Sequence, residues 1–331
     1  MGKILAIGEI MLRLSTSQQE RLAESSQFNN HYGGGEANVA ISLANFGHNA
    51  RFASKVPANP LGTAVKQHLN KYGVGTEELL FGGERLGIYF LETGAGFRPS
   101  SVIYDRSNSS FAQMQHLEWD FDTLFAEVEL LHLSGITPAL SSEWRKMMLQ
   151  LVKEAKRREI LVNLDINYRS KLWSIADCRA FVQELAPYLD FCSAARLDAL
   201  NFFEIPETDQ ALSDYYEKIR KRYPNIKVLY STTREVLNAQ HNRLQGNLYL
   251  NGKFYQSKVY NIPAIVDRVG AGDAFTGGVL HGLLEHSEPQ KLIDFATVAA
   301  VAKHTVHGDC NQFSKEQIEE FLLSGSNEIK R

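Results

Sequence analysis

The sequence predicts an α/β protein with a doubly wound, mainly parallel central sheet and a second, smaller β-sheet. Three observations predict it: short apolar runs typical of buried strands, helical patterns between those runs, and two segments with a different rhythm. Strands that alternate with helices in this way form βαβ units, whose strands are parallel. A chain of 331 residues is long enough to build such a fold around a sizeable core.

The predicted strands of the central sheet are nearly continuous apolar runs. They occupy residues 3–8, 130–134, 160–165 and 228–231. A strand that is buried on both faces has apolar residues at successive positions, whereas a half-buried strand alternates. These runs therefore favour a sheet that is covered by helices on both faces.

The predicted helices carry apolar residues at helical spacing. One begins near Ser141 and Ser142, which are good N-cap residues. Its apolar face is formed at positions i, i+3, i+4 and i+7 by Met148, Leu151, Val152 and Ala155. The chain ends in three more helical segments at about 270–286, 288–305 and 314–323.

Two segments interrupt the alternation of strands and helices. Residues 11–32 are polar with little helical period, and residues 86–105 alternate like exposed antiparallel strands. We expect lid strands from about 11–32 and 86–111, in a small sheet that covers a site. No linker, repeat or low-complexity tract divides the chain, so we expect one domain over residues 1–331 with this lid.

The composition excludes several classes of partner. A formal net charge of -3 gives no basic stripe for nucleic acid, and no apolar run approaches the ~20 residues of a membrane span. The chain lacks a signal-peptide pattern, and its three scattered cysteines suit a reducing compartment. We therefore expect a soluble, cytoplasmic protein with a small-molecule partner.

The strongest motif lies at residues 266–278, where Gly270, Ala271, Gly272 and Asp273 precede an apolar helical pattern. Small residues let a ligand approach the backbone, and the free N–H groups of the following helix attract an anion. The motif thus predicts an anion hole for a phosphoryl group. On its own, a tight turn with a capping aspartate explains the same residues. Alternatively, Asp273 is a general base that takes the proton from a substrate hydroxyl beside the anion hole.

A second glycine-rich motif runs over residues 33–40. Gly33, Gly34 and Gly35 open a helical pattern, and Asn38 lies one turn inside it. Backbone N–H groups at such a loop can contact a polar ligand, and Asn38 can bind either the ligand or a strand. Glycines before a helix are also common connectors, so this motif alone is weak.

Together, the two motifs resemble the Gly-Gly…Asn and Asp-Thr-x-Gly-Ala-Gly-Asp signatures of the ribokinase-like (phosphofructokinase-B-type) carbohydrate kinases. The resemblance covers essentially the whole chain. It implies a Rossmann-like αβα sandwich with a mainly parallel central sheet and a β-sheet lid. It also implies a kinase that uses ATP and Mg²⁺. Asp273 is then the general base, and Gly270, Ala271 and Gly272 form the anion hole beside the nucleotide.

Within that family, residues 87–92, 98–111 and 165–173 are most similar to the 2-keto-3-deoxygluconate kinases. This resemblance implies phosphorylation of the terminal 6-hydroxyl of 2-keto-3-deoxygluconate. It also implies a substrate site that combines the glycine-rich motif, the lid and the end of a central strand. Its residues are Gly34, Asn38, Tyr89, Tyr104, Arg106, Asn167 and Arg169.

The chemistry of these residues suits a sugar acid. Guanidinium groups and tyrosine hydroxyls bind a carboxylate by charge-assisted hydrogen bonds. Tyr104 and Arg106, at i and i+2, share one face of a strand, so we expect both to approach the ligand from the lid. Alternatively, Arg106 is an exposed lid cation that pairs with Asp105 or Glu92. Arg169 follows a predicted strand whose carboxyl end should face the cleft.

The sequence departs from the family pattern at residues 55–60, after the early helix, and at three places closer to the predicted site. Arg268 stands where the family usually has Thr, and it either helps to hold phosphate or points away. The acidic motif tied to Mg²⁺ is degenerate, with Asp198 as its best match, acting through water. The usual Gly-rich nucleotide turn is replaced by polar residues that are candidate ATP contacts: Ser231, Thr232 and Thr233. The adenine pocket has no assigned residues.

Two other functions remain open at this point. The first is a kinase of a neutral sugar such as fructose or ribose, in which Arg106 and Arg169 bind phosphate or solvent. The second is a sugar-binding regulator without catalysis. The intact run from Gly270 to Asp273 argues against a regulator, because a sensor needs no base beside an anion hole. By resemblance, we also expect a homo-oligomer that associates through the lid.

Overall fold

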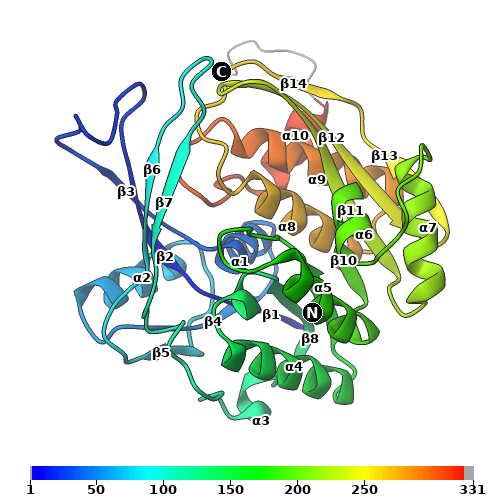
Figure 1. Cartoon of the computed structure of the whole chain (residues 1–331), viewed down its shortest axis with the longest axis horizontal. Helices are drawn as coiled ribbons and strands as arrows, with labels where there is room; N and C mark the ends of the chain where they lie inside the picture. The colour runs from blue at the N-terminus through cyan, green and yellow to red at the C-terminus, as the bar shows by residue number, and fades with distance from the viewer. Residues whose placement is uncertain (1, 324–331) are drawn as a thin grey trace.

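A large, mainly parallel sheet forms the centre of the molecule in this computed structural model, which describes residues 2–323 (Figure 1). The sheet is ten-stranded, with order β13-β12-β11-β10-β9-β8-β1-β4-β5 and β14 paired to β12. Seven neighbouring strands of this sheet are parallel: β11, β10, β9, β8, β1, β4 and β5. Strands β12, β13 and β14 add antiparallel pairs. The bounds are β1 Lys3–Ile7, β4 Ala50–Val56, β5 Leu79–Phe81, β8 Val128–Ser134, β9 Leu161–Asp165, β10 Phe191–Ser193, β11 Val228–Asn238, β12 His241–Leu250, β13 Lys253–Gln256 and β14 Tyr260–Ile262.

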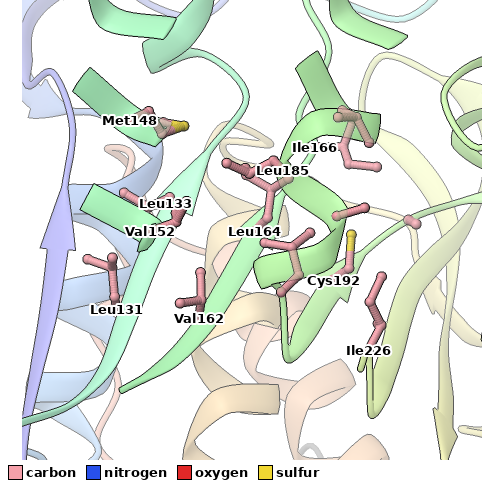
Figure 2. Close-up of a cluster of buried hydrophobic side chains, with 14 of the residues drawn as sticks. Leu131, Leu133, Met148, Val152, Val162, Leu164, Ile166, Leu185, Cys192 and Ile226 are labelled. Carbon is pink, nitrogen blue, oxygen red and sulfur yellow. The ribbon is translucent and has the colours of Figure 1, made fainter. Parts of the chain in front are cut away.

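Helices cover both faces of this sheet, which confirms the predicted αβα sandwich. Strand β1 shows why, because Leu5 and Ile7 enter one hydrophobic core while Ile4 and Ala6 enter the other. The first core, part of which Figure 2 shows, packs against α4 Ser142–Arg157, α5 Ile175–Leu185, α6 Arg196–Asn201 and α7 Leu212–Arg222. The second packs against α1 Gly35–Asn45, α2 Pro60–Lys71, α8 Ala271–Leu284 and α9 Pro289–Lys303. Shorter elements are α3 Phe121–Leu124, the 3₁₀ turns Thr137–Ala139 and Ala186–Tyr188, and α10 Lys315–Leu323.

Helix α4 illustrates how local sequence signals give an element its place. Ser141 is its N-cap, and the Ser141 hydroxyl accepts a hydrogen bond of 3.1 Å from the backbone N–H of Trp144. The predicted apolar face is fully buried against strands β8 and β9, as Figure 2 shows for Met148 and Val152. The end of α4 at Arg157 leaves Glu159 in a left-handed conformation before β9 begins.

The second sheet is four-stranded, with order β3-β2-β6-β7, and stands beside the central sheet at the left of Figure 1. Its strands are β2 Met11–Ser15, β3 Asn29–Gly33, β6 Ile88–Glu92 and β7 Ser101–Asp105. They lie in the two segments that interrupt the sequence rhythm, so the predicted small sheet is confirmed. Its tip meets the β11–β12 hairpin, where the Ala239 N–H donates a hydrogen bond of 2.9 Å to the Gly96 carbonyl.

The fold brings the ends of several elements to one place. β1 leads into Glu9 and β9 ends at Asp165, while α1 and α8 begin beside them. Carboxyl ends of parallel strands and N-termini of helices form the usual ligand edge of an open α/β sheet. Within residues 2–323, no helix combines the length and apolar character needed to cross a membrane.

Candidate active site

The turn before α8 requires glycine at its first position. Gly270 has φ +78°, and a Cβ atom there would lie 1.6 Å from the backbone carbonyl oxygen of Asp309. Gly272 differs, because a Cβ atom there would meet no atom within 4 Å. Both glycines line a cleft of about 360 Å³, whereas Ala271 does not. The first N–H groups of α8 have no partner within the helix, so this end of the cleft can receive an anion.

Asp273, in the first turn of α8, lines the same cleft. The Asn38 side-chain amide on α1 donates a hydrogen bond of 2.7 Å to its carboxylate. Burial raises the pKa of Asp273 to about 7. The hydrogen bond from Asn38 and the positive charge of Arg169 lower this pKa, whereas the negative charge of Asp165 raises it. A carboxylate with a pKa near neutrality is suited to accept a proton from a hydroxyl.

The glycine-rich loop before α1 packs tightly against the residues that follow β1. A Cβ atom at Gly34 would lie 2.1 Å from the backbone oxygen of Glu9. At Gly33, a Cβ atom would lie 2.2 Å from a carboxylate oxygen of Asp309. The glycines thus let α1 begin close enough to α8 for Asn38 to reach Asp273.

The cleft brings together most of the residues that the sequence indicates. Those that line it are Gly34, Asn38, Tyr89, Tyr104, Arg106, Asn167, Arg169, Gly270, Gly272 and Asp273. They come from α1, the lid strands β6 and β7, the segment after β9, and the start of α8. The small sheet therefore forms one wall of the cleft, and the central sheet with its helices forms the other.

Arg106 is buried and points into this cleft. Its Nε donates a hydrogen bond of 2.8 Å to Glu9, and its Nη2 also contacts that carboxylate. The Arg106 guanidinium lies 5.8 Å from the centre of the Tyr104 ring, as expected for residues on one strand face. The alternative of an exposed cation paired with Asp105 or Glu92 is wrong. Those two carboxylates pair instead with Arg85 and Arg98, at 2.8 and 2.6 Å.

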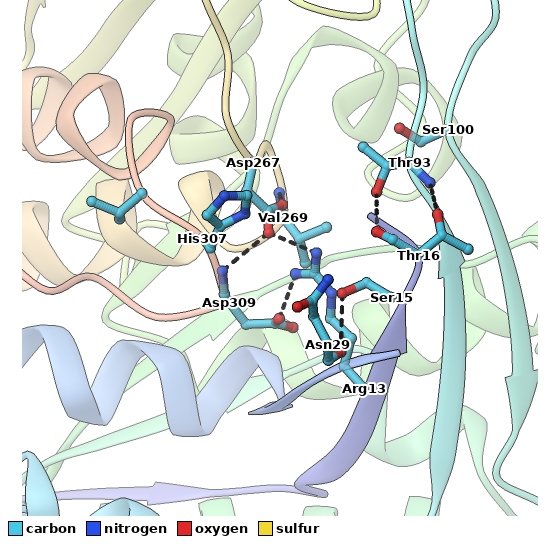
Figure 3. Close-up of polar contacts among 12 residues, drawn as sticks. Arg13, Ser15, Thr16, Asn29, Thr93, Ser100, Asp267, Val269, His307 and Asp309 are labelled. Carbon is cyan, nitrogen blue, oxygen red and sulfur yellow. Dashed lines mark hydrogen bonds and ion pairs between the residues drawn. The ribbon is translucent and has the colours of Figure 1, made fainter. Parts of the chain in front are cut away.

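A buried ion-pair network joins the lid to the anion-hole turn. In Figure 3, Arg13 reaches from lid strand β2 toward two carboxylates, at 2.6 Å from Asp267 and 2.8 Å from Asp309. Burial alone would lower the pKa of Arg13, but these carboxylates raise it overall. The hydroxyl of Tyr89 also donates to Asp309. The Asp267 carboxylate in turn accepts a hydrogen bond of 3.0 Å from the backbone N–H of Val269, the residue directly before Gly270.

Lys303, the last residue of α9, is a fully buried cation behind the same turn. Its ammonium group lies 3.3 Å from the Asp267 carbonyl oxygen and 3.4 Å from the Val306 carbonyl oxygen. Burial lowers the pKa of Lys303, while Asp267 and Asp309 oppose that effect. The lysine thus ties the segment before the anion hole to the loop after α9.

The comparisons with known proteins assign this chain to a family. Residues 1–316 match the family described as "pfkB family carbohydrate kinase". The chain belongs to the PfkB family of carbohydrate kinases. The fold and family that the sequence predicts are therefore confirmed, and the chain is a carbohydrate kinase.

Three relatives of this PfkB kinase align over nearly their full length. A PfkB family carbohydrate kinase from Listeria grayi is 43% identical, with a TM-score of 0.95 over 97% of this chain and 100% of that one. A 2-dehydro-3-deoxygluconokinase from Thermotoga maritima is 37% identical, with a TM-score of 0.94 over 98% and 100%. A 2-dehydro-3-deoxygalactonokinase from Haloferax volcanii is 30% identical, covering 100% of this chain and 99% of the relative.

Some residues that the sequence indicates do not line the cleft of this PfkB kinase. The carboxylate of Asp198 accepts a hydrogen bond of 2.7 Å from the N–H of Ala195 and caps α6. Ser231 is buried, and its hydroxyl accepts a hydrogen bond of 2.7 Å from Tyr216. Thr232 and Thr233 follow it on β11 and are also absent from the lining.

The cleft also contains residues that the sequence analysis missed. They are Glu9, Glu36, Asp165, Arg234 and Asp309. Asp165 is the last residue of β9, and its place at a strand end was a signal that could have found it. Burial raises the pKa of both Asp165 and Asp198 to about 6. The negative charge of Asp198 raises the pKa of Asp165 further.

The acidic groups of the cleft suit an ion that enters with a nucleotide. Among residues 2–323, no group of three His, Cys, Asp or Glu side chains forms a ready metal site. Mg²⁺ in kinases is usually held by one or two carboxylates, several waters and the substrate phosphates. Asp165 lines the cleft, and one carboxylate of this kind suits such a site, whereas Asp198 caps α6 outside the lining.

Proposed function

We propose that this kinase transfers the γ-phosphoryl group of ATP to the 6-hydroxyl of 2-keto-3-deoxygluconate. One observation carries the proposal: Asp273 lies in a single cleft with the anion-hole glycines on one side and Tyr104, Arg106 and Arg169 on the other. A sugar acid has a hydroxyl for the base and a carboxylate for the arginines. Relatives that act on 2-dehydro-3-deoxy sugar acids, by their names, support this choice.

In the proposed reaction, Asp273 takes the proton of the acceptor hydroxyl as its oxygen attacks the γ-phosphorus. The bond from that phosphorus to the β,γ-bridging oxygen breaks, and ADP leaves with the electron pair. The N–H groups at Gly270 to Gly272 stabilise negative charge on the transferring group. Asp165, which lines the cleft, would hold Mg²⁺ together with water and the phosphates, and the ion would supply further charge neutralisation there.

The Arg106 guanidinium is prepared to bind a carboxylate. Glu9 occupies its Nε and Nη2, whereas Nη1 has no partner within the described part of the chain. Tyr104 lies against the guanidinium, and its side chain is partly exposed to the cleft. A fixed guanidinium with a free edge loses little entropy when it binds a ligand.

The proposal is tested by ADP release with Mg²⁺-ATP and a panel of acceptors. The panel contains 2-keto-3-deoxygluconate, its C4 epimer 2-keto-3-deoxygalactonate, gluconate, fructose and ribose. The expected result is preference for a 2-keto-3-deoxy acid, and ³¹P–¹³C coupling in the product should place the phosphate on C6. Preference for fructose or ribose would overturn the choice of a sugar acid.

A matched pair of arginine variants tests the carboxylate contact. Arg106→Gln should raise the KM for the keto acid by about 10- to 100-fold, because a hydrogen bond to a charged group is lost. Arg85→Gln, which removes an exposed lid arginine paired with Asp105, should leave it unchanged. Equal effects of both substitutions would show that Arg106 does not contact the acid.

A further inference from the structure

The arginines around the cleft differ in their partners. Arg169, after β9, forms no ion pair with any residue that the structure describes and donates only to the backbone carbonyls of Asn167 and Tyr168, at 3.4 and 3.2 Å. Arg13 and Arg106 are neutralised by buried carboxylates.

The side chains of Arg234 and Arg268 form no ion pair or hydrogen bond with any residue that the structure describes. Arg234 comes from β11, and Arg268 lies between β14 and α8, so two separate elements each contribute an uncompensated cation.

These two arginines stand where two cavities meet. One is the cleft of about 360 Å³ that contains Asp273, and the other is a cavity of about 320 Å³ under the lid tip. Both Arg234 and Arg268 line both cavities. Arg268 precedes Gly270 by two residues, so its backbone leads directly into the anion-hole turn.

The two guanidinium groups are close enough to repel one another. Partial burial lowers the pKa of Arg234, and the positive charge of Arg268 lowers it further. Two like charges that line the same cavities without an ion-pair partner repel one another. A ligand with several negative charges removes this repulsion, whereas a sugar acid carries only one and has Arg106 and Tyr104 on the lid wall.

We propose that Arg234 and Arg268 clamp the polyphosphate chain of the donor nucleotide beside the anion hole. The proposal rests on the proposed phosphoryl transfer from ATP. Each guanidinium offers up to five N–H donors in a planar fork that matches phosphate oxygens. Arg268, two residues before Gly270, binds the phosphates nearest the transferring group, and Arg234 binds the polyphosphate from the β11–β12 hairpin.

The test is calorimetric binding without an acceptor, so it does not depend on turnover. The ligands are ATP, ADP, AMP, adenosine and inorganic tripolyphosphate, and the variants are Arg234→Gln, Arg268→Gln and Arg268→Lys. Arg243→Gln is the control, because Arg243 lies on the same hairpin, half exposed and paired with Glu235 at 3.1 Å. Thermal unfolding of each variant checks that it is folded.

Each Gln variant should bind ATP and tripolyphosphate about 10- to 100-fold more weakly, with a smaller loss for AMP and none for adenosine. Arg268→Lys should give an intermediate loss, and Arg243→Gln none. Equal losses for adenosine and ATP, or unchanged ATP affinity in an active enzyme, would overturn the clamp while leaving the proposed function standing. A wild-type protein that binds no nucleotide would overturn both.

Discussion

The side-chain amide of Asn38 donates a hydrogen bond of 2.7 Å to the carboxylate of Asp273. The two residues are far apart in the sequence, and the glycine-rich loop before α1 brings them together. A hydrogen bond to a carboxylate favours its charged form, so Asn38 opposes the effect of burial on Asp273. The protonation state of the proposed base is therefore set by a residue on another helix.

Replacement of the base should separate catalysis from binding. Asp273→Asn keeps the size of the side chain but removes its ability to accept a proton. We expect kcat to fall by about 10²- to 10⁴-fold, since this is the usual contribution of general-base catalysis. Steady-state kinetics measure the loss, and calorimetry should show nearly unchanged binding of nucleotide and acceptor. Asp209→Asn, at an exposed position, is the control, and normal turnover of Asp273→Asn would reject the mechanism.

The pH profile should report the same carboxylate. Because Asp273 acts as a base only when deprotonated, kcat/KM should rise with pH through a midpoint near its pKa of about 7 and then level off. Asn38→Ala removes a hydrogen bond that favours the charged form, so the midpoint should move to higher pH. Profiles of the two proteins with the same acceptor measure the shift. Asn70→Ala, at an exposed position of α2, is the control. A midpoint that stays in place or moves down would contradict this role of Asn38.

The cost of burying Asp273 should appear in the stability of the protein. The folded pKa of about 7 lies above the unfolded value of about 4, so the folded chain binds more protons between these values. The protonated Asp273 carboxyl group therefore contributes stability that is fully present below pH 4 and is lost as the pH rises through 7. At pH 8, Asp273→Asn should be more stable than wild type by about 1–3 kcal/mol.

Urea unfolding at pH 8 and pH 5 measures this difference. The advantage of Asp273→Asn should shrink at pH 5, where the wild-type carboxylate is mostly protonated. Asp209→Asn should change neither value. An Asn variant with equal or lower stability at pH 8 would show that burial does not destabilise the charged base.

The sequence predicts the parts of this site that depend on local pattern. The runs from Gly270 to Asp273 and from Gly34 to Asn38 are recognised by glycines at a fixed spacing from a polar side chain. At Gly270 and Gly34 a Cβ atom would clash with a backbone carbonyl, so these two positions require glycine. Tyr104 and Arg106 are placed together by the two-residue period of a strand. Each of these predictions uses information within a few residues, which one sequence contains.

The residues that the sequence does not predict act through distant contacts. Asp309 lies in a loop after α9 and reaches the site only because Arg13 and Tyr89 on the lid approach it. Nothing near Asp309 in the chain indicates that partnership. Ser231 shows the opposite error. The sequence predicts a strand that ends there, but β11 continues to Asn238, and Ser231 is buried within it and bonded to Tyr216. Long-range packing decides both cases.

Glu9 should act as a positioning residue for Arg106. Glu9→Gln leaves the buried Arg106 guanidinium without its counter-charge, which can cost up to about 3–5 kcal/mol in unfolding free energy. The KM for the keto acid should rise, whereas the KM for ATP should not, because Arg106 lies on the lid wall. Urea unfolding and steady-state kinetics measure the two effects.

The control for Glu9 is Glu118→Gln, which breaks a partly exposed pair with Lys55. That change should cost no more than about 1 kcal/mol and leave both KM values unchanged. If Glu9→Gln lowers stability but preserves the KM for the keto acid, Glu9 supports the fold and does not position Arg106.

Two glycines of the anion hole should respond differently to the same substitution. Gly270→Ala forces a Cβ atom toward the Asp309 carbonyl at a residue with φ +78°, so it should lower both stability and kcat. Gly272→Ala meets no atom within 4 Å and lies in the first turn of α8, so stability should stay equal or rise by about 0.5–1 kcal/mol. Its methyl group projects into the cleft where the phosphoryl group is proposed to bind, so kcat should still fall. Urea unfolding and kinetics of both variants check this contrast. Full activity of Gly272→Ala would place the transferring phosphate elsewhere, because a methyl group cannot share the space of a phosphate oxygen.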